Sequence, residues 1–152
     1  MLRAAIAEAR AFESWQDYQD ALKRAIMPLT DAQLQRRLLP GLRTPGEIAE
    51  HIVFGRALHL HRTLGTVEEL TPLLRWEDTD NPPHTAAEIL QGLELTWQVI
   101  TASLMRGSPT DDISEDEAPI AQTIWGLLDH DLPHAGELSL LLGADGIAGV
   151  EI

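Results

Sequence analysis

The sequence lacks cysteine entirely. Without cysteine the chain forms no disulfide, offers no thiolate to a metal ion and has no thiol nucleophile of its own. The absence leaves the redox state of its compartment undetermined. It also restricts any metal site to histidine, aspartate and glutamate side chains.

Long apolar runs are missing as well. No segment approaches the ~20 consecutive apolar residues that a membrane-spanning helix needs. The N-terminal stretch MLRAAIAEARAFE contains acidic residues where a secretory signal would have a continuous apolar core. We therefore expect a cytoplasmic protein with no membrane partner.

Basic residues are scarce, since 11 Lys and Arg face 24 Asp and Glu and the formal net charge is −13. The acidic excess is greatest after Arg106, where acidic residues recur and no further Lys or Arg follows. Such a surface repels a phosphate backbone over most of its area. The composition therefore predicts that the protein has no nucleic-acid partner.

The apolar residues that are present recur three or four positions apart, which is the period of an amphipathic helix. At 152 residues with 44% hydrophobic composition, the chain is long enough for one domain, residues 1–152, with its own core. The pattern predicts four long helices, about residues 4–27, 44–64, 85–106 and 119–143, with a short helical connector after Thr30. We expect an all-α, antiparallel four-helix bundle.

Local signals fix several of these boundaries. Thr44 is followed by Pro45 and Glu47, which together form a capping box with proline at the first helical position. Gly65 marks the expected end of that helix. The segment from Thr71 to Pro83 is the longest expected linker between helices.

Histidines occur on the inward stripes of two of these helices. In the segment DHDLPHAGE, His130 and His134 stand four residues apart and therefore share one helix face. His51 belongs to the comparable stripe of the second helix, and neighbouring helices would bring it opposite the pair. Three neutral imidazoles with an open fourth position are typical of catalytic zinc sites, and nickel, iron or manganese would also accept them.

Two points count against assigning a metal site from the spacing of these histidines. Inward histidines are often hydrogen-bonded core residues, so their spacing alone does not establish a metal site. Pro133 lies between His130 and His134, removes the N–H that would bond the carbonyl of Asp129, and predicts a kink that tilts His134 away from the shared face.

Three segments resemble, in order, the DinB-like (DinB/YfiT) superfamily. They are TPGEIAEHIVFGRALHLHRTLG (44–65), HTAAEILQGLELTWQVI (84–100) and IWGLLDHDLPHAGELSLLLGADGI (124–147). The most specific part is the His-x-x-x-His followed by Gly-Glu and then Leu-Gly-x-x-Gly. The resemblance implies a four-helix bundle, commonly a homodimer, with a divalent metal on a histidine triad that corresponds to His51, His130 and His134.

The resemblance also implies a function. It indicates a metal-dependent enzyme, either a hydrolase or a transferase that uses a low-molecular-weight thiol, acting on a small-molecule substrate. A chain without cysteine is compatible with an external thiol nucleophile. The alternative is a non-catalytic, stress-related binding module in which the metal site is structural or vestigial.

The sequence also suggests roles for other polar residues near the histidines. Glu137, one turn beyond His134, is the candidate to orient a histidine or to act as a catalytic base, and its alternative is a solvated helix surface. His59, two turns beyond His51, is the candidate to line the pocket. We expect His61 and His84 to be surface or capping residues.

Overall fold

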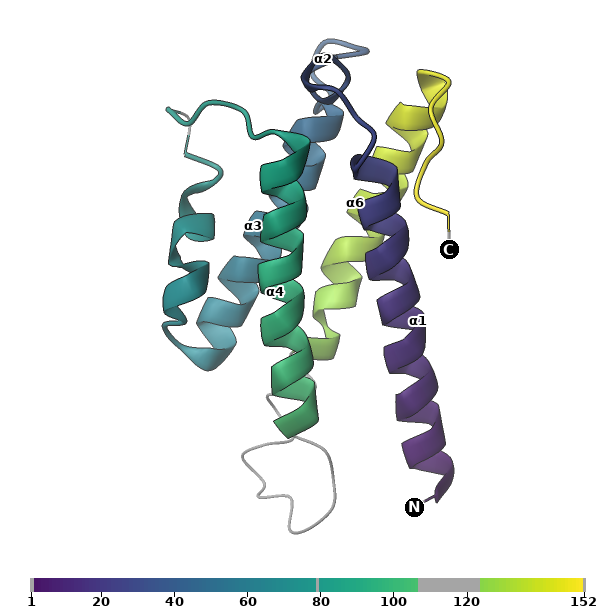
Figure 1. The fold of residues 1–152 in the computed structure, drawn as a ribbon, viewed down its shortest axis with the longest axis vertical. Coiled ribbons are helices and arrows are strands. Elements are labelled where there is room, and N and C mark those ends of the chain that lie inside the picture. Colours follow the sequence, from purple (N-terminus) through teal and green to yellow (C-terminus); the bar gives the residue numbers. More distant parts are fainter. Residues whose placement is uncertain (1, 79, 107–123, 152) are drawn as a thin grey trace.

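The computed structural model describes residues 2–78, 80–106 and 124–151, and every regular element in those ranges is helical. In the described ranges the chain forms four long helices and two short helical segments, whose arrangement is drawn in Figure 1. The elements are α1 (Leu2–Ile26), α2 (Asp31–Leu34), α3 (Pro45–Leu64), the 3-10 segment η1 (Glu68–Arg75), α4 (Ala86–Arg106) and α6 (Leu127–Ala144). The expected all-α four-helix bundle is confirmed.

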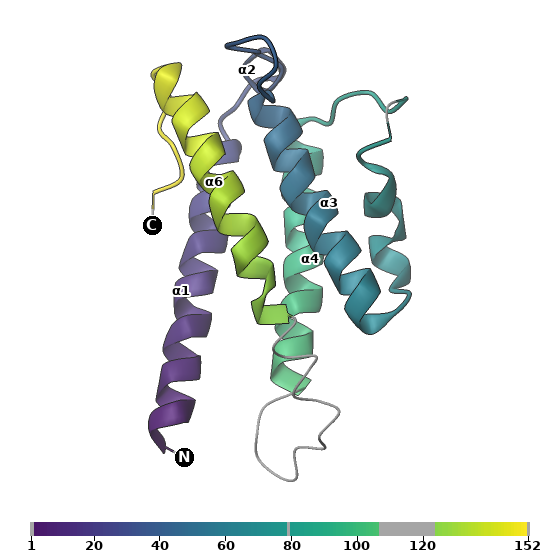
Figure 2. The same cartoon turned by 180° about the vertical axis from the view of Figure 1, so that it is seen from behind.

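The path of the chain through η1 determines how α3 and α4 are directed relative to each other. Helix α3 runs antiparallel to α6, and α1 runs antiparallel to α4 (Figures 1 and 2). Between α3 and α4, the chain travels back along the bundle through η1, so these two neighbouring helices point the same way. The antiparallel contact between α3 and α6 carries the three histidines.

The predicted helix boundaries agree closely with the observed ones. The Thr44 hydroxyl accepts from the backbone N–H of Glu47 at 3.1 Å, and the Glu47 carboxylate accepts from the backbone N–H of Thr44 at 2.7 Å. Helix α3 ends at Gly65, whose φ of 81° suits a residue without a Cβ. The expected start of the fourth helix near Pro119 lies outside the described residues.

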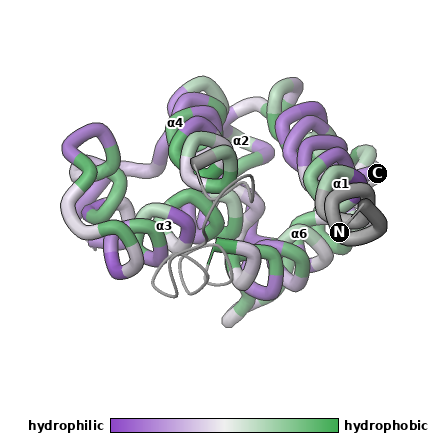
Figure 3. The backbone as a smooth tube through the Cα atoms, turned by 90° about the horizontal axis from the view of Figure 1, so that it is seen from below, coloured by the Kyte–Doolittle hydropathy of each residue, from purple (hydrophilic) through white to green (hydrophobic). Residues whose placement is uncertain are grey.

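The core lies where the apolar faces of the four helices meet (Figure 3). Leu22, Ile52, Leu93 and Leu138, one from each long helix, are all 0% exposed. Burying such a side chain contributes about 1.5–3 kcal/mol each, so this shared interior fixes the relative positions of the helices. Within the described residues, no helix combines the length and the hydrophobicity needed to cross a membrane.

The segment η1 begins at Glu68 and overlaps the first part of the stretch Thr71–Pro83 that the sequence predicted to be a linker. Trp76, directly after it, approaches Gly92 of α4 so closely that a Cβ there would lie 2.7 Å from the indole. The same ring stacks on His84 with ring centroids 4.0 Å apart. These contacts fix the backbone at Glu77 beside α3.

Candidate metal centre

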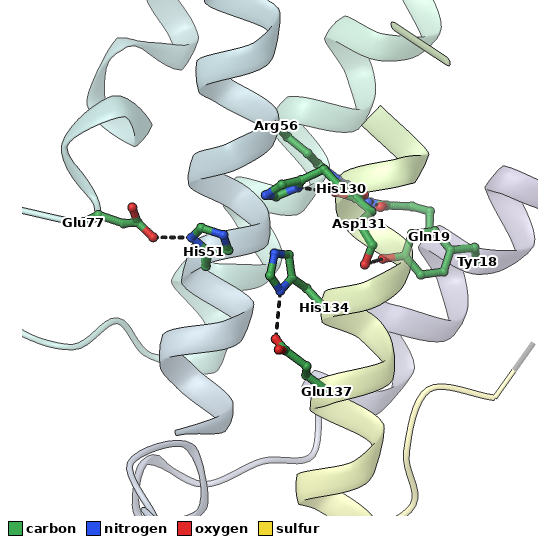
Figure 4. Close-up of polar contacts among 9 residues, drawn as sticks. All are labelled: Tyr18, Gln19, His51, Arg56, Glu77, His130, Asp131, His134 and Glu137. Carbon is green, nitrogen blue, oxygen red and sulfur yellow. Dashed lines mark hydrogen bonds and ion pairs between the residues drawn. The ribbon is translucent and has the colours of Figure 1, made fainter. Parts of the chain in front are cut away.

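Three histidines converge between α3 and α6. His51 comes from the second turn of α3, and His130 and His134 come from α6 (Figure 4). The ring centroid of His51 lies 5.2 Å from that of His130 and 4.5 Å from that of His134, and the latter two are 4.9 Å apart. One nitrogen from each ring lies within 4.8 Å of the others. The inward stripes of the sequence therefore do bring the three predicted residues together.

Pro133 does not separate the histidine pair. Helix α6 runs from Leu127 to Ala144 with the proline inside it, and the His130 and His134 rings remain adjacent. Pro133 and Asp129 are both exposed, so water can bond the carbonyl that the proline leaves without a donor. The expected displacement of His134 is absent because the proline lies on the solvent side of the helix.

Each histidine has a carboxylate beside its Nδ1 atom. Nδ1 of His51 contacts Glu77, Nδ1 of His134 lies 2.8 Å from Glu137, and Nδ1 of His130 lies 3.3 Å from Asp131. If Nδ1 carries the proton and its N–H donates a hydrogen bond to the carboxylate, each Nε2 is left with its lone pair available to an ion. Glu137 thus lies against His134, and its role in orienting that histidine stays a prediction.

The carboxylate beside His130 belongs to a buried ion pair. Asp131 and Arg56 are both 0% exposed, with Nε of Arg56 2.6 Å from Oδ2 of Asp131. Nη1 of Arg56 also donates to the Gln19 side chain at 2.7 Å. The Tyr18 hydroxyl donates to the backbone carbonyl of Asp131 at 3.4 Å (Figure 4). Burial, and then the charge of Asp131, raise the pKa of Tyr18, so the phenol stays a donor.

Sequence reasoning missed Glu77 and this ion pair. The signal for the pair was present, since Arg56 follows Ile48 and Ile52 at intervals of four on the inward face of α3. Asp131 likewise lies between buried Leu127 and Ala135 on α6. Glu77 had no comparable signal, because its place beside His51 depends on how η1 packs.

The surroundings of His51 favour its neutral form. Burial lowers the pKa of His51 below its usual value, and the charge of Arg43 acts in the same direction. The hydrogen bond to Glu77 opposes this effect without overcoming it. A neutral imidazole is the form that binds a metal ion, so His51 needs to lose no proton to become a ligand near pH 7.

The ring of His130 lies directly against the backbone of α3 at Gly55. A Cβ at position 55 would lie 2.2 Å from Cε1 and 2.5 Å from Nε2 of His130. Real Cβ atoms do not approach other atoms this closely, so any side chain here would displace the imidazole. Glycine at this position is thus what allows His130 to reach the other two rings.

The remaining histidines lie apart from this cluster. His59 is half-buried two turns beyond His51, and its role in lining the pocket stays a prediction. His84 differs from its expected surface or capping role: its ring stacks on Trp76 and its Nδ1 lies 3.2 Å from the Glu50 carboxylate. It therefore helps to hold the segment after η1 against α3.

We expect Pro133→Ala to stabilise the protein while leaving metal affinity almost unchanged. The alanine restores an N–H for the Asp129 carbonyl and removes the ring that crowds it, a change worth up to about 3 kcal/mol in a helix interior. Because the rings of His130 and His134 are already adjacent, the substitution should change the distance between them little. Chemical denaturation and zinc titration of both proteins measure the two effects. A large gain in affinity would show that the proline strains the pair.

Comparison with solved structures gives the fold an independent match. The chain superposes on the crystal structure of a DinB-like protein from Bacillus cereus ATCC 10987 with a TM-score of 0.67, covering 93% of this chain and 94% of that one, at 20% sequence identity. No family model and no curated protein matches the sequence. At this identity the match establishes architecture alone. The chain therefore has the DinB-like helical fold, and within it His51, His130 and His134 form a group that could hold a metal ion.

Proposed function

We propose that the protein is a divalent-metal-dependent enzyme that uses His51, His130 and His134 as metal ligands. The observation that carries the proposal is the convergence of three histidine nitrogens from two helices within 4.8 Å of one another. A carboxylate beside each ring supports it, since such partners usually orient metal-binding histidines. Zinc, nickel, iron and manganese all accept this donor set.

Three imidazole nitrogens from neighbouring helix faces form a donor set that suits one divalent ion. Ligand nitrogens around a tetrahedral zinc ion lie roughly 3.4 Å apart, given zinc–nitrogen bonds of about 2.0–2.1 Å. The three nitrogens lie within 4.8 Å of one another, so they would move closer together on binding one ion. Their side chains are 19%, 29% and 20% exposed for His51, His130 and His134, so a small molecule can approach them from solvent.

The proposed chemistry is activation of a nucleophile. A bound divalent ion would acidify a water molecule or a thiol at its open position. With water the reaction is a hydrolysis, and with a low-molecular-weight thiol it is a transfer to an electrophilic substrate. The chain contains no cysteine, so the thiol would come from a second small molecule. Glu77 and Glu137 would hold His51 and His134 in the tautomer that presents Nε2.

Calorimetric titration of the chelator-stripped protein with zinc or nickel tests the ligand set. We expect one ion per chain in the wild type, and loss of binding in His51→Ala and in His134→Ala, because two imidazoles hold an ion poorly against solvent. His61→Ala is the matched control, since this histidine lies on α3 outside the triad. Unchanged affinity in His134→Ala would refute the site.

Turnover separates the enzyme from the alternative, a non-catalytic module with a structural metal. The alternative is favoured by one observation: Glu77, Asp131 and Glu137, the carboxylates that touch the triad, are all engaged by a histidine. Metal-dependent consumption of an electrophile with a small thiol, or of an ester with water, supports the enzyme. A metal-dependent rise in Tm with no turnover supports the module.

A further inference from the structure

A polar pocket of about 590 Å³ lies beside the histidine triad. One side comes from the chain between α2 and the first turns of α3, and the other from the segment after η1. Glu77 belongs to both sites, because it lines the pocket and its carboxylate contacts His51. The volume lies within the range of about 300–1,000 Å³ that is usual for small-molecule sites.

The charged side chains of the pocket are almost all paired. Those that line it are Arg37, Arg43, Glu47, Glu50, Glu77 and Asp78. The four carboxylates are engaged as follows: Glu47 by Arg37 at 2.6 Å, Asp78 by Arg75 at 3.2 Å, Glu50 by the backbone N–H of His84 at 2.7 Å, and Glu77 by His51. Arg43 makes no hydrogen bond or ion pair with any residue that the structure describes, and its charge acts on Glu47 and His51 at longer range.

We propose that Arg43 binds a carboxylate of the substrate or co-substrate whose reactive group reaches the histidine triad. This inference rests on the proposed function and adds the class of molecule that the site accepts. A guanidinium presents its N–H groups in a planar fork that matches a carboxylate. Trp76, Pro82 and Pro83 supply apolar surface for the carbon skeleton of the same molecule.

The charges around Arg43 favour a ligand with one negative charge over a ligand with two. Four carboxylates and two arginines line the pocket, so a phosphate dianion would be repelled more strongly than a carboxylate monoanion. Hydrogen bonding to histidines and arginines occupies the carboxylates without removing their charge. The pocket therefore favours a small monocarboxylate over a phosphorylated compound.

The position of Arg43 also limits the length of the ligand. Arg43 directly precedes Thr44, whose capping box fixes the backbone there. His51 lies seven residues beyond Thr44 on the same helix, roughly 10 Å along its axis. The arginine side chain spans part of that distance, so a carboxylate separated by two or three carbons from its reactive group suits the remaining gap.

Cobalt-loaded protein offers a direct test with thiol probes, since a thiolate bound to cobalt gives a measurable absorption band. The probes are 3-mercaptopropionate, which carries one carboxylate, the uncharged 2-mercaptoethanol, and 2-mercaptoethyl phosphate. We expect the wild type to bind 3-mercaptopropionate about tenfold more tightly than 2-mercaptoethanol, the ratio for one charge-assisted contact. We expect it to bind the phosphate more weakly than the carboxylate.

Arg43→Gln should abolish this preference, so that cobalt-loaded protein binds 3-mercaptopropionate no more tightly than 2-mercaptoethanol. Arg62→Gln is the control, because it removes the same charge from the far end of α3, outside the pocket. Equal affinity for the charged and uncharged thiols in wild-type protein that holds cobalt would overturn the inference and leave the proposed function standing. A preference that survives in Arg43→Gln would overturn it as well.

A metal-free measurement keeps the two proposals separable. If cobalt does not bind, the proposed function fails, and propionate is titrated against the nitrogen-15-labelled protein instead. A saturable shift of the Arg43 Nε–H resonance, absent when ethanol replaces propionate, supports the carboxylate site. An unshifted resonance overturns it.

Discussion

Replacement of Asp131 by Leu together with Arg56 by Met should leave the bundle folded and weaken metal binding by roughly 10–100-fold. Both side chains are 0% exposed and pair at 2.6 Å, and exchanging such a pair for apolar residues is often neutral or stabilising by about 1–4 kcal/mol. The exchange also removes the oxygen 3.3 Å from Nδ1 of His130. Zinc titration and thermal unfolding measure the two effects on one sample.

Single substitutions provide the controls for that result. Arg56→Met leaves the Asp131 carboxylate buried without its partner, and should destabilise the protein by about 3–5 kcal/mol. Asp131→Asn keeps an oxygen beside His130 and should retain more metal affinity than the double variant. A double variant that binds zinc as tightly as the wild type would show that the ion pair serves the fold alone.

The features that the sequence predicted well are those with local causes. The capping box of Thr44 and Glu47 and the stop at Gly65 depend on residues within one turn, so α3 begins and ends where expected. The histidine triad depends on helical phase: a residue on the apolar stripe must face the bundle interior once the helix packs. The stripes of two helices are therefore sufficient to indicate His51, His130 and His134.

The features that the sequence did not predict depend on packing between distant segments. Glu77 reaches His51 because Trp76 docks against Gly92 of α4, a contact that no local pattern announces. The shared direction of α3 and α4 has the same origin in η1. Pro133 was expected to tilt His134, but its effect depends on which face of α6 meets solvent, and the structure places the proline outside.

Gly55 shows how one small residue connects helix packing to the site. Helices α3 and α6 must lie close together for His51 to meet His130 and His134, yet an imidazole needs room between them. The missing side chain at position 55 provides that room, and the ring of His130 fills it. Helical propensity alone would favour alanine here by roughly 0.5–1 kcal/mol, so the choice of glycine is explained by the site and not by the helix.

Gly55→Ala should therefore reduce metal affinity by at least about 100-fold in a protein that still folds, since the displaced ring is one of three ligands. A Cβ at this position would lie 2.2 Å from Cε1 of His130, and the imidazole, which is 29% exposed on its side chain, can swing outward to relieve the overlap. Zinc titration measures the loss, and circular dichroism checks that the helical content is kept.

Gly143→Ala is the matched control, because this glycine also lies within a helix but has no heavy atom within 4 Å of an added Cβ. The control should gain stability from the better helix former and bind zinc like the wild type. Wild-type affinity in Gly55→Ala would show that the position of His130 against α3 is not needed to hold the ion.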